Sequence, residues 1–459
     1  MSYRVKIVAS ALALVMAATS VGAAQAQSIT QALTTAYDHA PDLQSALLAA
    51  KASAENVALA NAGKRPTIGA SLGGTYAWSA GQASQANPGG AYVGSQTYTA
   101  GLSYNQTIFD NFKTDAQIEA ARAGAEAAEH QIRNTEQNVL LSVVEAYMAV
   151  LSGRQLVALR QENNSFFQAQ LQSAQDRLDV GEGTRIDVAQ AQARLAQGDA
   201  TYRAALSQLE ISQATFQRYV GAPPSNLSAS HNFGNLIPNS LQAAISEAEV
   251  GHPAILMSKA AIRAAQAGSD AAQAAGGPSA SISGQVGTGY NSASGSQGLS
   301  GSLGFQITVP IYAGGAIGAG VRKANIEQIK SEVDAMSSYD QIREAVISAW
   351  AGMQSADAQI SAASAAVSAG TTVLDGVIQE RDLGTRTTLD VLNSQAELTT
   401  ARESLINASS NKVIATFSLL SAMGRLTATN LGLPVEVKSA VRYNQAVEDV
   451  WQELRTVAE

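Results

Sequence analysis

The chain has 459 residues, of which 46% are hydrophobic, 5% aromatic and 14% charged, and its formal net charge is −8. Because the apolar residues are mostly alanine, valine and leucine, the composition favours closely packed helices over a large globular core. No basic patch offsets the negative charge, which argues against a nucleic-acid partner. The absence of cysteine excludes disulfides, cysteine-based zinc sites and a lipid-modified N-terminal cysteine.

The first residues have the pattern of a signal peptide. Arg4 and Lys6 precede an apolar run over residues 7–16, and an Ala-Gln-Ala cleavage site ends at Ala26. The apolar run is too short for the alternative, an N-terminal membrane anchor. We therefore expect residues 1–26 to be removed on export, which changes the net charge to −10.

Later segments are not expected to cross a membrane as helices, because none supplies about 20 consecutive apolar residues. If the mature chain enters a membrane, it must do so as β-strands that close into a barrel.

The sequence contains one structural plan twice. An offset of 212 residues relates the segment ending at Pro41 to the segment ending at Pro253, and an offset of 203 relates Gly181 to Gly384. Each copy reads as a helix, two strands, a long helix, a tight turn and a shorter helix, which indicates an ancient duplication. The predicted parts are a first repeat at 27–222, a linker at 223–238, a second repeat at 239–424 and an unrepeated tail at 425–459 with a helix near 440–457.

The strands of both repeats alternate between apolar and polar residues, as in a sheet with two different faces. They form predicted hairpins at residues 67–109 and 279–312. Segments of about 10 to 12 residues with this alternation and terminal aromatics are typical of a lipid-facing barrel wall. A soluble β-sandwich with one face packed inward is the alternative.

Four strands cannot close a transmembrane barrel, since about eight is the smallest number, and an open edge in lipid is not tolerated. Several chains must therefore share one barrel. Two chains would make eight strands with an interior filled by side chains, whereas three would make twelve with room for a conduit.

The helices are unusually long. Residues 114–178 contain no proline and would span on the order of 100 Å, while 29–63 and 185–219 would span about 50 Å each. The tight turns between long and short helices are predicted at 179–184 and 382–386. A coiled-coil seam along 195–220 is indicated by apolar residues that step by sevens, fours and threes: Leu195, Tyr202, Leu206, Leu209, Phe216 and Val220.

Enzymatic motifs are hard to find, and we expect neither catalytic residues nor a cofactor or metal. The histidines lack metal-ligand spacing and are expected at the surface or at helix caps: His39, His130, His231 and His252. The run GGAIGAG at 314–320 lies between a strand and a helix but does not complete a dinucleotide-binding loop. Its counterpart, DNFKTDAQ at 110–117, lacks glycine, so we interpret 314–320 as a flexible junction.

With these residues in view, the chain resembles the TolC family of outer-membrane efflux proteins along nearly all of its mature length. The most specific stretches are DLGTRTTLDVLNSQAELTTARESL at 382–405 and its echo DVGEGTRIDVAQAQARL at 179–195. Both are glycine turns between helices followed by an Asp-Val pair, similar to the periplasmic hairpin tips of that family. The FQITVPIYAGG stretch at 305–315 fits as well.

The resemblance implies an α+β membrane protein of the Gram-negative outer membrane with a large periplasmic portion. It implies a homotrimer with a shared 12-stranded barrel in outer-membrane lipid and a helical coiled-coil tunnel that closes at the tips. The implied partners are a periplasmic adaptor and an inner-membrane pump or ABC exporter. The implied function is the exit duct of a tripartite efflux pump or type I secretion system.

The resemblance also implies roles for residues near the tip turns. Asp390 would project into the entrance as a ring of carboxylates, and Asn393 stands where the family often has a second aspartate, which would weaken that ring. Arg386 resembles the arginine that links neighbouring helices in the closed entrance, with Asp187 as its acidic partner. The alternative for these charges is an ordinary solvated helix end. The turns themselves contain Gly181, Gly183 and Gly384.

A periplasmic adaptor or structural coiled-coil protein of an export complex is the alternative function, because such proteins also have long alanine-rich hairpins. Two complete hairpins and four lipid-type strands favour the channel. The nature of the cargo is left open between drugs, metals and secreted proteins.

Overall fold

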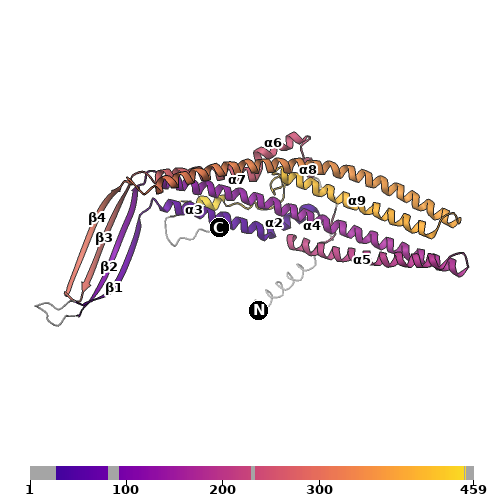
Figure 1. Cartoon of the computed structure of the whole chain (residues 1–459), viewed down its shortest axis with the longest axis horizontal. Helices are drawn as coiled ribbons and strands as arrows, with labels where there is room; N and C mark the ends of the chain where they lie inside the picture. Colours follow the sequence, from indigo (N-terminus) through magenta and orange to yellow (C-terminus); the bar gives the residue numbers. More distant parts are fainter. Residues whose placement is uncertain (1–26, 81–91, 229–232, 449, 451–459) are drawn as a thin grey trace, which may run out of the picture. The chain divides into compact units, whose positions relative to one another are not determined.

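A computed structural model describes residues 27–80, 92–228, 233–448 and 450 (Figure 1). The chain forms two compact units, and each unit draws on both sequence repeats. The first comprises the chain up to Leu43, Thr135–His252 and Ile342–Val437; the second comprises Gln44–Asn134, Pro253–Gln341 and the chain from Lys438. The repeats seen in the sequence are therefore not the compact units of the fold.

The second unit contains a four-stranded antiparallel sheet in the order β1-β2-β3-β4, with strands side by side in Figure 1. Its strands are β1 (Thr67–Ala80), β2 (Tyr92–Phe109), β3 (Ser279–Asn291) and β4 (Ser296–Thr308). The sheet joins the hairpins of the two repeats through β2 and β3, where Ala100 lies opposite Thr288.

The pairing register keeps all the large apolar side chains on one face of the sheet. Ile68 lies opposite Tyr104, and Leu102 lies opposite Val286. The apolar face is exposed in the isolated chain, with 89% exposure at Leu72 and 84% at Leu303. The other face consists mainly of serine, threonine, glycine, asparagine and glutamine, with Ala77 among them. The pairing thus places the apolar residues of neighbouring strands on the same face of the predicted two-faced sheet. A wall between an apolar and a polar medium requires this arrangement.

The helix predicted at 29–63 is interrupted before a proline. α2 (Ile29–His39) has Ala40 as its C-cap, and α3 (Pro41–Ala62) begins at the next residue. Proline lacks the N–H that would continue the helix, and it disfavours helical geometry at the residue before it. The second repeat has the same break, with α6 (Leu241–Gly251) and α7 (Pro253–Ala274). The prediction of one continuous helix over 29–63 is therefore wrong at Ala40.

Each repeat then forms a long helical hairpin. α4 (Lys113–Asp179) and α8 (Ala316–Asp382) have 67 residues each. They turn back into α5 (Arg185–Val220) and α9 (Thr388–Ala422). A short 3-10 helix, η1 (Phe233–Leu236), lies between the repeats.

In the first unit, the hairpins pack through small and aromatic side chains. Phe167 and Ala174 of α4, Ala191 of α5 and Leu392 of α9 form one buried cluster. A second cluster joins α8 and α9, and Phe166 packs against both clusters. Alanine at contact positions lets helix backbones approach closely, which suits the alanine-rich composition.

α4 and α8 bear on the expectation that no later helix crosses a membrane. Each contains an 18-residue window that is long and apolar enough to cross a membrane, judged by length and composition. The same property is common in buried core helices, and 44% of the α4 window is buried here.

The C-terminal tail is fastened to α3 and α4 within the second unit. α10 (Val441–Glu448) is shorter than the predicted helix near 440–457, whose last residues lie outside the described part of the chain. The carboxylate of Glu448 pairs with Arg122 at 2.5 Å, and the hydroxyl of Tyr443 donates to Glu55 at 2.6 Å. Polar contacts and the buried side chain of Val447 thus attach this tail together.

Candidate functional site at the two hairpin turns

The two tip turns have the same backbone geometry. Gly181 and Gly384 have φ angles of 82° and 81°, a left-handed conformation that only glycine adopts without a steric penalty. The N–H after each glycine donates back into the preceding helix, from Glu182 to the Arg177 carbonyl at 2.8 Å and from Thr385 to the Glu380 carbonyl at 2.9 Å. These bonds define a Schellman motif, which ends a helix by satisfying its last carbonyls.

Gly183 is needed for a different reason. Its N–H also donates to the Arg177 carbonyl, at 2.9 Å, and a Cβ atom here would lie 3.0 Å from the backbone nitrogen of Leu178. The equivalent position of the second repeat is Arg386. The two turns therefore share a backbone plan but differ in charge.

The aspartates predicted near the tips both close capping boxes. The Asp187 carboxylate accepts from the hydroxyl of Thr184 at 2.7 Å, and the Asp390 carboxylate accepts from the hydroxyl of Thr387 at 2.8 Å. Each threonine hydroxyl in turn accepts from the aspartate N–H, at 3.2 Å in both turns. This reciprocal arrangement satisfies N–H groups that a helix start otherwise leaves unpaired.

Asp390 is also tuned electrostatically. The backbone N–H of Thr387 donates to its carboxylate at 2.9 Å, and this hydrogen bond, then that from the hydroxyl, lowers the pKa of Asp390. The positive charge of Arg386 lowers it further. The group therefore stays ionised to more acidic pH than an ordinary aspartate.

Arg386 makes its ion pair within its own turn. Its Nε lies 2.8 Å from the Glu380 carboxylate, and this hydrogen bond raises the pKa of Arg386. In the described part of the chain, Arg386 and Asp187 are thus engaged with Glu380 and Thr184, not with each other. The predicted link from Arg386 to Asp187 across neighbouring helices stays a prediction.

Asn393 joins the two hairpins. Its side-chain oxygen accepts from the Arg194 guanidinium of α5 at 2.8 Å. A carboxylate at position 393 would meet this arginine directly, so its charge would be partly neutralised. The sequence motif contains Arg194, but nothing in its spacing indicated this partner on another helix.

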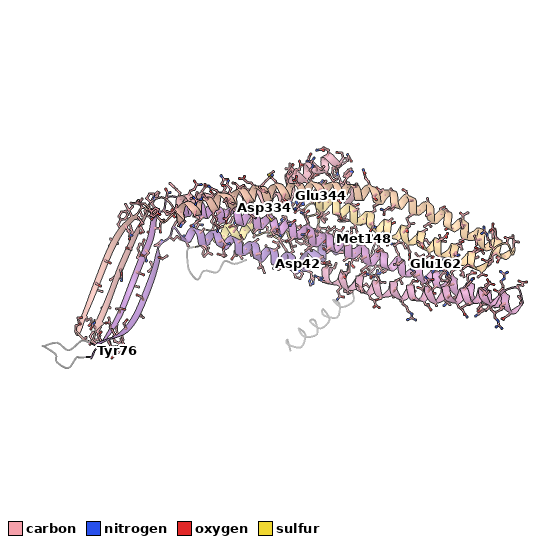
Figure 2. All side chains as sticks on the ribbon, viewed as in Figure 1. Asp42, Tyr76, Met148, Glu162, Asp334 and Glu344 are labelled. Carbon is pink, nitrogen blue, oxygen red and sulfur yellow. The ribbon has the colours of Figure 1, made fainter. Side chains whose placement is uncertain are left out.

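A buried polar cluster between α4 and α9 was missed by the sequence analysis. The Asn163 oxygen accepts from the Gln395 amide and from the Thr399 hydroxyl, each at 3.0 Å. Nearby, Arg402 pairs with Glu162, which Figure 2 labels on α4, at 2.9 Å. The available signal was the recurrence of glutamine in the repeats, at Gln192 and Gln395.

The described histidines lie in mixed surroundings. His39 ends α2, and His252 is the buried C-cap of α6, where burial lowers its pKa. His130 lies 3.8 Å from Glu126, and His231 is outside the described residues. In the described ranges, no group of three or more His, Asp or Glu side chains is arranged to hold a metal ion.

The fold is that of outer-membrane channels. The Campylobacter jejuni CmeC outer membrane channel superimposes with a TM-score of 0.75 at 15% sequence identity, covering 92% of this chain and 89% of CmeC.

The family is shown by sequence. The family model for outer membrane efflux proteins matches residues 32–222 and 244–425. Outer membrane efflux protein BepC of Brucella suis is 36% identical, covering 95% of this chain and 93% of BepC. Outer membrane protein TolC of Escherichia coli is 25% identical, covering 89% of this chain and 84% of TolC. The chain belongs to the outer membrane efflux protein family and is a protein of the Gram-negative outer membrane with a large periplasmic part.

Proposed function

We propose that this chain is the exit duct of a tripartite efflux pump or type I secretion system. It receives substrates from an inner-membrane pump or ABC exporter through a periplasmic adaptor and passes them across the periplasm and outer membrane. The observation that carries the proposal is the four-stranded sheet with one continuous, exposed apolar face, on a chain that otherwise consists of long helical hairpins.

The sheet supports a shared barrel. β1 and β4 are its edge strands, and an edge with unpaired N–H and C=O groups is not stable in lipid. Pairing β4 of one copy with β1 of the next satisfies both edges. Three copies make twelve strands and leave a conduit, whereas two make eight and leave an interior that side chains fill. The face of serine, threonine and glycine would then line the water-filled interior.

The entrance is assigned to the hairpin turns. In a trimer, three Asp390 carboxylates would converge near the axis, where charged rings select cations. Arg386 of one copy and Asp187 of the next would hold the entrance closed. The capping role of both aspartates is the competing explanation, so the variants that test this assignment must preserve the caps.

A periplasmic adaptor is the rival function, and long hairpins alone would suit it. In a periplasmic adaptor, the apolar face of the sheet, which reaches 89% exposure at Leu72, would lie in water. Exposed apolar area of this extent in an exported protein calls for lipid or a protein partner.

The test is direct. We expect the full-length protein in outer-membrane fractions as a trimer-sized band that converts to monomer on heating, and we expect the purified trimer to conduct in planar bilayers. A monomer in the soluble periplasmic fraction would contradict the proposal and favour the adaptor.

A further inference from the structure

The connection from β2 to α4 contains a cavity that the exit-duct function does not use. The cavity has a volume of about 470 Å³ and lies where the sheet meets the helices, at the end opposite Tyr76, which Figure 2 labels. Its lining combines charged and polar side chains with two aromatic rings, those of Phe109 and Phe112, and includes Lys64, Thr107 and Asp115. A volume of this size suits a small polar ligand or the headgroup of a larger one.

The backbone beside the cavity is strained. Asn111 and Phe112 have φ angles of 57° and 67°, which non-glycine residues rarely adopt and which cost a bulky residue most. The Phe112 ring remains 67% exposed, so the strain does not serve core packing. Strain that persists in this way is concentrated at functional sites.

Local contacts hold this conformation. The Asn111 amide donates to the Ala274 carbonyl at 3.2 Å, and the Asp110 carboxylate accepts from the Thr114 N–H at 2.8 Å. Phe112 packs edge to face on Phe109 at 5.8 Å, and β2 carries a bulge immediately before this point. Bulges at sheet ends redirect side chains, here toward the cavity and its mouth.

The second repeat shows that the same turn can form without strained non-glycine residues. The equivalents of Asn111 and Phe112 are Gly314 and Gly315, whose φ angles of 62° and 86° follow the same path without strain. The charged lining is absent there as well: alanine or glycine stands at the positions equivalent to Lys64, Asp110 and Asp115, namely Gly276, Ala313 and Gly318. The duplication has therefore produced one charged, strained junction and one glycine junction.

The charges of the first junction match a zwitterion. Lys64 pairs with Asp115 at the cavity, and both side chains are about half exposed. Asp110 adds a second carboxylate. One ammonium and two carboxylates can receive a phosphate and a primary ammonium at once through charge-assisted hydrogen bonds.

The apolar surroundings indicate that this zwitterion belongs to a lipid. Ile108, 53% exposed, continues the apolar face of β2 to the cavity, and Phe112 stands at its edge. Aromatic side chains at the ends of barrel strands mark the level of the lipid headgroups. A lipid whose acyl chains lie on the apolar face would therefore place its headgroup at the cavity.

We propose that the β2–α4 junction is a binding site for the headgroup of a zwitterionic aminophospholipid, with Lys64 at the phosphate and Asp110 and Asp115 at the ammonium. The site rests on the proposed function, because it requires the sheet to be embedded in lipid. It places the periplasmic boundary of the membrane at this junction and makes the first repeat the lipid-anchored one.

The experiment measures lipids retained by the full-length trimer. The trimer is reconstituted in nanodiscs containing phosphatidylethanolamine, phosphatidylcholine or phosphatidylglycerol, released into detergent and analysed by native mass spectrometry. We expect one tightly held phosphatidylethanolamine per chain. Less phosphatidylcholine should be retained, because its headgroup lacks ammonium N–H donors. Less phosphatidylglycerol should be retained, because its headgroup lacks the ammonium.

Lys64→Gln and Asp115→Asn should each reduce this retention about tenfold, the effect of losing one charge-assisted hydrogen bond. Lys323→Gln is the matched control: it removes an exposed lysine that pairs with Glu327 at the corresponding end of α8, and retention should not change.

Equal retention of the three lipids by the unchanged protein would overturn the site, and so would loss in the control as large as in the two variants. If one variant fails to form trimers, the comparison of lipids on the unchanged protein still decides. A protein that conducts as a trimer but shows no lipid preference leaves the exit duct intact and removes only the headgroup site. A protein that forms no trimer in membranes removes the exit duct instead.

Discussion

Asp187 and Asp390 occupy equivalent positions of the two repeats, and each carboxylate accepts hydrogen bonds from a threonine three residues earlier, at 2.7 and 2.8 Å from its hydroxyl. An alanine at either position would remove a charge and, together with it, the carboxylate half of the capping box, while the N-cap threonine stays in place. Asparagine removes the charge but keeps an oxygen that can accept the cap hydrogen bond. Asparagine variants therefore show the effect of the lost charge on conduction without a large loss of helix stability.

Asp390→Asn should abolish both cation preference and block by a trivalent cation added on the periplasmic side. The reason is that three carboxylates on a narrow axis create a strong local field. Single-channel currents of the reconstituted trimer provide the measurement, and Asp187→Asn, with the same cap chemistry, should retain the block. Intact block and selectivity in Asp390→Asn would show that this side chain does not line the pore.

The cation preference should survive mild acidification. Within each chain, hydrogen bonds from Thr387 lower the pKa of Asp390 and so oppose the rise in pKa that three neighbouring carboxylates cause in one another. The ionised Asp390 carboxylate also contributes to folding stability. This contribution is present at neutral pH and is lost only as pH falls through the lowered pKa. Thr387→Val should move the midpoint of selectivity to higher pH. Reversal potentials between about pH 6 and pH 3 would measure it, and an unchanged midpoint in Thr387→Val would show that the Thr387 hydroxyl does not contribute to the lowered pKa.

Arg386→Ser should raise the conductance of the resting channel. A link between Arg386 and Asp187 of neighbouring copies would favour closure by about 0–1 kcal/mol per exposed pair, and three copies add. Asp187→Asn should have the same effect, and combining the two should add little. Glu380→Gln is the discriminating control, because Glu380 holds Arg386 within its turn at 2.8 Å. If Glu380→Gln alone opens the channel and Asp187→Asn does not, closure depends on the internal pair.

Asn393→Asp should strengthen trivalent block only weakly. The Arg194 guanidinium lies 2.8 Å from the Asn393 oxygen and would pair with the new carboxylate. Adding Arg194→Gln should release that charge and produce the tighter block of a six-carboxylate entrance. Titration of block in the single and double variants tests this, and tight block in Asn393→Asp alone would exclude neutralisation by Arg194.

Leu303→Arg should impair membrane assembly by about 2–4 kcal/mol if the residue lies near the bilayer midplane, whereas Ser302→Arg should be tolerated. Leu303 is 84% exposed on the apolar face, and the neighbouring Ser302 lies on the polar face opposite Gln285. The yield of heat-modifiable trimer in outer-membrane fractions measures the difference. Equal yields from the two variants would count against a lipid-facing wall.

Several features of this protein could be derived from sequence because they depend on local chemistry. Alternation along 67–109 determined a two-faced sheet, since successive strand residues point to opposite sides. Gly181 and Gly384 marked the turns because a left-handed backbone there favours glycine. The sequence motif also contained Asp390, because this aspartate follows its glycine turn at the same distance as Asp187 follows the first turn.

Other features depend on which helices and strands lie together, and only the tertiary structure decided them. The pairing of Leu102 with Val286 joins strands from different repeats, and Arg194 meets Asn393 across two helices that are distant in sequence. Spacing along the sequence does not identify such partners, because the residues of each pair are far apart in the chain. In addition, a long side chain such as that of Arg194 can reach several polar groups. The sequence by itself thus determined the period, the turns and the family, whereas packing decided the register of the sheet, the partner of each charge, and the strained junction at Phe112 that its glycine counterpart avoids.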